Sequence, residues 1–180
     1  MDIQMLIAIA SLITSIGTIA AVLIAKKAFH IAEKSFRADH ERRKKQVTIE
    51  YYNNIFITAT IPLRQELRKA FGENYYKHRI LPDDEKWKEN TVLYDRVITY
   101  CRSMERFAVG ISIGVFDFDT FNRFSGKTTV MLFEQIQPII EEKRKIMDYN
   151  AYCEEFQSLY LDLSRKQIPT RQDGSISNYP

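Results

Sequence analysis

Residues 3–25, with the sequence IQMLIAIASLITSIGTIAAVLIA, contain no charged side chain. As an α-helix rising about 1.5 Å per residue, this stretch extends roughly 34 Å, enough for a bilayer hydrocarbon core of about 30 Å. A cleaved signal peptide has a basic leader and a shorter apolar core, whereas only Met1 and Asp2 precede this stretch. The sequence therefore predicts one retained transmembrane helix over residues 1–25.

The basic side chains near this stretch all follow it, and none precedes it. They are Lys26, Lys27, Lys34, Arg37, Arg42, Arg43, Lys44 and Lys45. Segments rich in Lys and Arg stay in the cytoplasm. We therefore expect the protein in the cell inner membrane, with its N-terminus outside and its C-terminal domain in the cytoplasm. The lysines next to the span suit contact with membrane lipid head groups.

Small and polar residues of the apolar stretch fall on one side of the predicted helix. They alternate in steps of four and three, as the inner positions of a heptad repeat do: Gln4, Ala8, Ser11, Ser15, Thr18, Val22 and Ala25. The same register continues into the cytoplasmic part at Phe29, Ala32 and Phe36. Such residues let membrane helices approach closely. Since the chain offers one span, we expect a homo-oligomer.

Two interpretations of this face of the helix remain open. In the first, it only joins copies of a membrane anchor. In the second, several copies surround an ion pore, because polar residues are tolerated in a membrane where they line water. The pore-lining residues are then Gln4, Ser11, Ser15 and Thr18. Phe29 and Phe36 form aromatic rings below the pore and act as its gate.

A second basic cluster lies further along the chain and comprises Arg42, Arg43, Lys44 and Lys45. If the first helix continues, this cluster is more than about 20 Å from the membrane surface, beyond the Debye length of roughly 8–10 Å. It is either a solvated face interleaved with Asp39 and Glu41, or a site for an anionic ligand such as a nucleotide or nucleic acid. The net charge of +3 does not by itself indicate a nucleic-acid binder.

The remaining chain predicts an all-α fold. No Gly or Pro lies between Gly17 and Pro62, so residues 26–61 are expected to form a basic juxtamembrane helix that continues the span. Residues 62–166 are expected to form a cytoplasmic helical bundle against that helix. The polar tail, residues 167–180, is expected to be disordered.

Two features support helices within the cytoplasmic domain. Pro62 suits the first turn of a helix that Gly72 ends. Apolar residues recur at helical spacing from Val92 to Phe107. Glu105 and Arg106 interrupt this apolar pattern, which predicts a buried or interface salt bridge.

No set of residues in the sequence predicts catalysis. Cys101 and Cys153 have no metal-ligand spacing with the histidines, and we expect both to be buried as small hydrophobic residues. The sequence contains no Ser-His-Asp, Cys-His or zinc-binding arrangement. We therefore expect neither an enzyme nor a site for a metal or cofactor.

Residues 100–117, YCRSMERFAVGISIGVFD, resemble the central run of a bacterial family of unknown function. Its members have an N-terminal membrane helix, a basic juxtamembrane helix and a short helical domain. Glu105, Gly110 and Gly114 are the most recognisable positions. The layout is also similar to small membrane effectors of antiphage systems, such as the Hailong channel effector. That resemblance implies an oligomer that holds a closed pore until a nucleotide-derived signal changes.

These observations favour a homo-oligomeric membrane effector that forms a gated ion channel in antiphage defence by abortive infection. The cytoplasmic domain then controls assembly and gating. The alternative is a non-conducting, membrane-anchored adaptor whose helical domain binds a regulatory protein.

Overall fold

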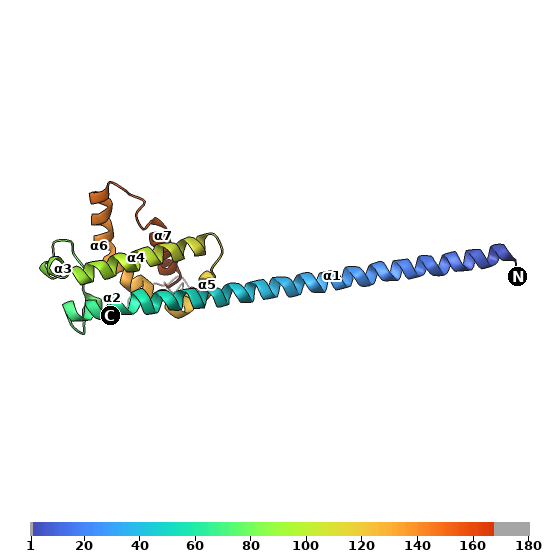
Figure 1. Ribbon diagram of the computed structural model, residues 1–180, viewed down its shortest axis with the longest axis horizontal. Helices are drawn as coiled ribbons and strands as arrows, with labels where there is room; N and C mark the ends of the chain where they lie inside the picture. The colour runs from blue at the N-terminus through green and yellow to red at the C-terminus, as the bar shows by residue number, and fades with distance from the viewer. Residues whose placement is uncertain (1, 168–180) are drawn as a thin grey trace, which may run out of the picture. The chain divides into compact units, whose positions relative to one another are not determined.

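The computed structural model describes residues 2–167, and within this range the chain forms helices and no strand (Figure 1). The all-α prediction is confirmed. The chain divides into two compact units, with the boundary between Arg43 and Lys44. Of the tail predicted to be disordered, all but Gln167 lies outside the described residues.

Helix α1 runs Ile3–Ile55 without interruption (Figure 1). This continuity agrees with the absence of Gly and Pro between Gly17 and Pro62. Among the described residues, the structure has one helix long and apolar enough to cross a membrane, and it lies near the N-terminus. None of its apolar segment is buried.

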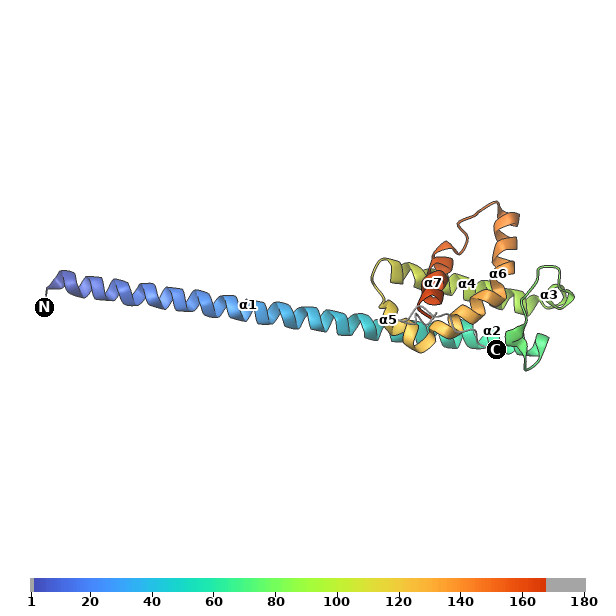
Figure 2. The same ribbon diagram turned by 180° about the vertical axis from the view of Figure 1, so that it is seen from behind.

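The second unit begins with the end of α1 and a π-helical turn, Phe56–Thr60. The α-helices that follow are α2 (Ile61–Phe71), α3 (Glu85–Glu89), α4 (Thr91–Ser112), α5 (Phe118–Phe121), α6 (Lys127–Met147) and α7 (Glu154–Gln167). A short 3-10 helix, Tyr75–Lys77, follows α2, and a second π-helical turn, Asn122–Gly126, precedes α6. Helix α4 lies alongside α2 and the first π-helical turn (Figure 2), and α7 packs on α4.

Local sequence sets the ends of these helices. Pro62 occupies the first turn of α2, directly after the π-helical turn Phe56–Thr60. Gly72 ends α2 with a φ of 79°, and its N–H donates to the Arg68 carbonyl at 2.8 Å. Asn90 caps α4 by accepting a hydrogen bond from the Leu93 N–H at 3.0 Å. The predicted start and end of the helix after Pro62 are confirmed.

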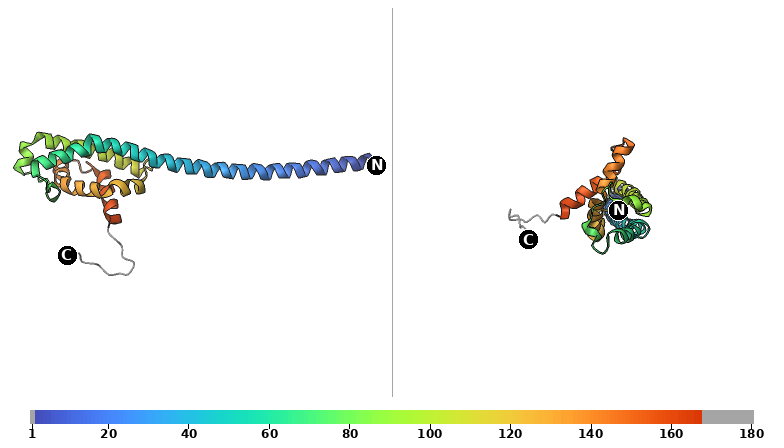
Figure 3. Two further views of the ribbon diagram at one scale, coloured as in Figure 1. Left: turned by 90° about the horizontal axis from the view of Figure 1, so that it is seen from below. Right: turned by 90° about the vertical axis from the view of Figure 1, so that its left-hand side faces the viewer.

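The helices of the second unit, which Figure 3 shows from two further sides, pack around one hydrophobic core. Helix α4 supplies one face of it, with Leu93, Val97, Tyr100, Cys101, Met104 and Phe107 each 0% exposed. Phe107 stacks on Phe116 at 5.0 Å between ring centroids and meets the edge of Phe121 at 4.7 Å. Cys101 and Cys153 are both buried free thiols, as predicted.

Neither Glu105 nor Arg106 has an ion-pair partner among the described residues, so the predicted buried salt bridge is wrong, whereas a salt bridge to another chain stays a prediction. The Glu105 carboxylate instead accepts hydrogen bonds from the backbone N–H groups of Glu155, at 3.2 Å, and Phe156, at 2.8 Å. These N–H groups belong to the first turn of α7, where backbone N–H groups have no carbonyl partner within the helix. The helix dipole also favours a negative charge at this end. Glu105 therefore ties α4 to the start of α7.

Two buried tyrosines of the core differ in how their hydroxyl groups are satisfied. The Tyr52 hydroxyl accepts a hydrogen bond from Ser125 Oγ at 2.5 Å. The Tyr100 hydroxyl makes no hydrogen bond of good geometry among the described residues, although it interacts with the nearby Thr129 hydroxyl. A buried polar group without a partner destabilises the folded state, whereas a satisfied one contributes about 1 kcal/mol. We therefore expect Tyr52→Phe to lower the free energy of unfolding by about 1 kcal/mol, and Tyr100→Phe to lower it by less.

Denaturant unfolding of the two variants, followed by circular dichroism, measures this difference. Each substitution is the matched control for the other, because both remove one hydroxyl from a buried ring. A larger loss of stability for Tyr100→Phe than for Tyr52→Phe would contradict the assignment.

Candidate functional site

The residues predicted to line a pore or a gate lie on one face of α1, which we call the α1 stripe: Gln4, Ser11, Ser15, Thr18, Phe29 and Phe36. All of them are exposed in the protomer. The side chains of Phe29 and Phe36 are 73% and 75% exposed, although both lie beyond the apolar span. The protomer thus leaves the whole α1 stripe without a covering surface.

The hydroxyl groups of Ser15 and Thr18 on the α1 stripe bond to their own helix. Ser15 Oγ donates to the Ser11 carbonyl at 2.9 Å, and Thr18 Oγ1 donates to the Thr14 carbonyl at 2.9 Å. This is the common way for Ser and Thr to satisfy their proton inside a helix. Each hydroxyl oxygen keeps its lone pairs, so the exposed polar atoms at Ser15 and Thr18 are hydrogen-bond acceptors.

The basic cluster Arg42, Arg43, Lys44 and Lys45 falls on both sides of the boundary between the two units. In the first unit, Arg43 Nε contacts Asp39 Oδ2 at 2.9 Å, and its side chain is 77% exposed. Such an exposed pair contributes well under 1 kcal/mol and exchanges readily with solvent ions. The anionic-ligand role of the cluster stays a prediction.

Lys44 and Lys45 in the second unit act on Asp117, which caps α5. Its carboxylate accepts a hydrogen bond from the Thr120 N–H at 2.8 Å, and its own N–H donates to the buried Thr48 Oγ1 at 2.7 Å. Partial burial raises the pKa of Asp117, but the hydrogen bonds from Thr120 and the charges of Lys45 and Lys44 outweigh it, so the pKa is lowered. Part of the basic cluster therefore stabilises the charged cap of α5.

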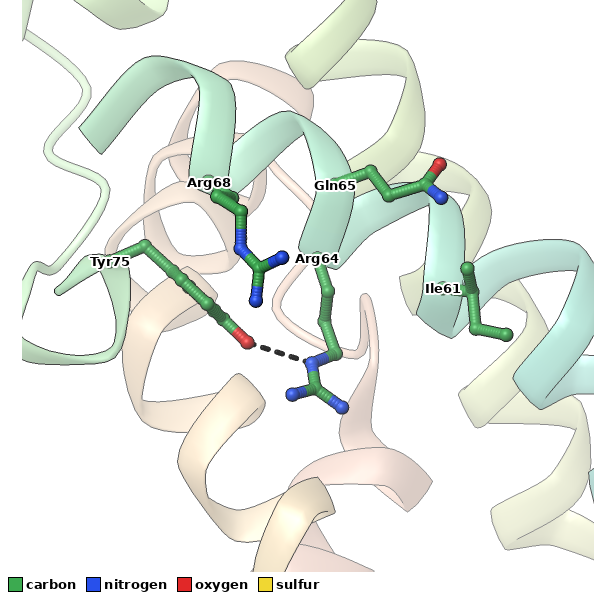
Figure 4. Close-up of a pocket in the computed structure, with 5 residues that line it drawn as sticks. All are labelled: Ile61, Arg64, Gln65, Arg68 and Tyr75. Carbon is green, nitrogen blue, oxygen red and sulfur yellow. Dashed lines mark hydrogen bonds between the residues drawn. The ribbon is translucent and has the colours of Figure 1, made fainter. Parts of the chain in front are cut away.

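A small pocket on α2 was not predicted from the sequence. It has a volume of about 130 Å³ and is lined by Ile61, Arg64, Gln65, Arg68 and Tyr75. Figure 4 shows the guanidinium groups of Arg64 and Arg68 on the side of α2 that faces Tyr75, while the Gln65 side chain points away from them. Arg64 Nε donates to the Tyr75 hydroxyl at 2.7 Å.

Tyr75 is held firmly at this pocket. Its residue is 5% exposed, and its backbone carbonyl accepts a hydrogen bond from Gln135 Nε2 of α6 at 2.9 Å. The backbone carbonyl of Gln135 in turn accepts a hydrogen bond from the Ile80 N–H at 2.8 Å, which fixes the loop that carries Tyr75. The hydroxyl therefore has a defined place beside the two arginines.

The sequence did carry one trace of this pocket. Arg64 and Arg68 are four residues apart, so they share a face of α2, where like charges repel by a few tenths of a kcal/mol. The third member, Tyr75, reaches them only because Gly72 turns the chain back and Gln135 holds the returning loop. Those are tertiary contacts, which helical spacing does not reveal.

The comparisons with known proteins give one family. Residues 5–163 match the model of the domain of unknown function DUF4760. No curated protein and no solved structure matches the chain. The match covers most of the sequence, including the apolar N-terminal helix and the second unit up to the last turns of α7. The chain therefore belongs to the DUF4760 family, whose function is unknown.

Proposed function

We propose that this protein is a homo-oligomeric membrane effector in which the α1 helices of several copies surround a gated ion pore. The observation that carries the proposal is the exposed α1 stripe, which continues in one heptad register from Gln4 to Phe36. Lipid suits exposed apolar side chains within the span, but water surrounds Phe29 and Phe36 beyond it. Burying each of these rings between parallel copies contributes about 1.5–3 kcal/mol.

The composition of the stripe favours a pore over simple association. Within the span the stripe presents the hydroxyl oxygens of Ser15 and Thr18 as acceptors, whose protons are already bonded to their own helix. Such oxygens suit a water-filled path, because water can donate hydrogen bonds to them. Phe29 and Phe36 then form apolar constrictions that close the path by excluding water.

The proposed function also includes an orientation in the membrane and a cellular role. The basic residues after the span favour an N-terminus outside and a second unit in the cytoplasm, where it controls assembly and gating. A protein with this orientation belongs in the cell inner membrane, with its second unit facing the cytoplasm. The similarity in layout to small antiphage membrane effectors supports a role in abortive infection, in which an open pore discharges the membrane of an infected cell.

Planar-bilayer recordings of the purified full-length protein test this function. We expect discrete conductance steps from an oligomer, with the oligomer mass measured in the same detergent preparation. A monomeric protein, or a protein silent in every recording condition, would contradict the proposal.

A variant whose residues 3–25 are replaced by an unrelated apolar helix separates the channel from the adaptor. A channel loses both conductance and its effect on growing cells when the part of the α1 stripe within the span is removed. An adaptor keeps its cellular effect, because its span only holds the second unit at the membrane.

A further inference from the structure

The pocket between α2 and Tyr75 combines positive charge with directed hydrogen-bond donors. Arg64 has no carboxylate partner among the described residues, although its side chain is partly buried. Arg68 contacts Glu73 at 3.4 Å, but the two side chains are 59% and 80% exposed, so this pair is weak and easily exchanged. The pocket therefore carries more positive charge than its own residues neutralise.

The hydrogen bond to Tyr75 determines which atoms of Arg64 remain available. Because Nε is the donor to the Tyr75 hydroxyl, both terminal NH₂ groups are left for a ligand. The tyrosine oxygen acts as the acceptor in that bond, so its own proton is also left to donate. Arg68 adds a second guanidinium one helical turn away. All of these groups are donors, and together they form a cradle for an oxyanion.

The number of donors and the size of the pocket limit the ligand. A carboxylate offers acceptors in one plane, whereas a phosphate group offers strong acceptor oxygens in several directions, which suits two guanidinium groups and a hydroxyl. The pocket has a volume of about 130 Å³. It fits a phosphate group, but it is well below the roughly 300–1,000 Å³ of sites that enclose a whole drug-sized molecule.

A second pocket shares one lining residue, Arg64, with the first. It has a volume of about 300 Å³. Its other lining residues are aromatic or carry hydroxyl and amide groups: Tyr52, Asn53, Phe56, Phe124, Ser125 and Thr128. Both π-helical turns contribute to it, through Phe56 and through Phe124 and Ser125. Such turns interrupt α-helices frequently at functional sites.

We propose that Arg64, Arg68 and the Tyr75 hydroxyl form a binding site for the phosphate group of a phosphate monoester. The organic part of the ligand extends toward the second pocket. This inference does not depend on ion conduction, because the site lies wholly within the second unit. A soluble nucleotide and a lipid head group both present this chemistry, and the experiment distinguishes them.

Binding is measured by isothermal titration calorimetry on the full-length protein in detergent, with three probes. These are inorganic phosphate, adenosine 5′-monophosphate, and mixed micelles that contain phosphatidic acid. We expect Arg64→Gln and Arg68→Gln each to weaken binding by about tenfold or more, since each removes charge-assisted hydrogen bonds. Tyr75→Phe keeps the buried ring and removes only the hydroxyl, so a smaller loss of roughly threefold to tenfold is expected.

Arg96→Gln is the matched control, because Arg96 is an exposed arginine on α4 outside the lining of both pockets. Circular dichroism melting of every variant shows that it is folded. Binding of adenosine monophosphate but not of the lipid micelles identifies a soluble ligand, and the reverse identifies a head group. Binding of none of the probes, or an equal loss in Arg96→Gln and Arg64→Gln, overturns the proposal.

Discussion

Full-length protein carrying Ser15→Leu and Thr18→Leu is expected to assemble normally and to conduct no ions. Both residues lie on the α1 stripe within the span, and their hydroxyl oxygens are among the polar atoms that the proposed pore offers to water. Leucine fills heptad positions well, so helix association should persist or strengthen. At the axis, however, each copy adds a bulky apolar side chain, which narrows the path and excludes water. Single-channel recordings should show conductance reduced at least about tenfold.

The control for this experiment changes the opposite side of the same helix. Leu12→Ile and Ile16→Leu keep the apolar volume at residues outside the α1 stripe, and should leave conductance unchanged. The oligomer mass in detergent is measured for both double variants. Conductance equal to that of the unmodified protein after Ser15→Leu and Thr18→Leu would exclude a pore along the stripe, even if the oligomer forms.

Phe107→Ala is expected to lower the free energy of unfolding of the second unit by about 3–5 kcal/mol. The ring is 0% exposed and lies between three parts of the chain. It contacts the end of α1 through Tyr52, at 5.6 Å between ring centroids, and it also contacts Phe116 before α5 and Phe121 in α5. Its removal leaves a cavity and forfeits several aromatic pairs, each contributing about 0.5–1.5 kcal/mol beyond the buried area.

Denaturant unfolding followed by tyrosine and tryptophan fluorescence measures this loss. Because a domain of this size is stable by only about 5–15 kcal/mol, the variant should lose a large fraction of its stability. Phe107→Leu, which keeps most of the volume, should lose less than half as much. Ile113→Ala removes an apolar side chain that is 69% exposed and should change stability by no more than about 0.5 kcal/mol. Equal losses for Phe107→Ala and Ile113→Ala would contradict the core assignment.

The sequence motif around α4 shows how far local patterns lead. Helical spacing predicted that Phe107 belongs to a helix. The reasons for Gly110, Gly114 and Glu105, however, lie in the tertiary structure. A Cβ at Gly110 would lie 2.3 Å from the Phe116 ring, so only glycine lets that ring pack on α4. Gly114 has a φ of 79°, which turns the chain toward α5. Glu105 is placed by α7, fifty residues later in the chain.

The same distinction applies to the candidate sites. The α1 stripe follows from heptad spacing alone, because it lies on one uninterrupted helix. The pocket of Arg64, Arg68 and Tyr75 needs the turn at Gly72 and the hydrogen bond from Gln135, and neither has a periodic pattern. The basic cluster could be found in the sequence. The contribution of Lys45 and Lys44 to the lowered pKa of Asp117, however, depends on how α5 packs. Sequence patterns therefore predicted the surface of one helix and missed the contacts between helices.

The hydrogen bonds from Ser15 and Thr18 to their own helix bear on the biogenesis of such a protein. A newly made span must leave the insertion machinery and enter lipid before it meets any other copy. A hydroxyl proton without a partner would oppose this step, whereas both protons are already satisfied within a single α1. Under the proposed function, a lone chain would therefore partition into the bilayer, diffuse laterally and assemble later. In the proposed assembly, the amount of protein in the membrane, rather than the moment of synthesis, would then set when complexes form.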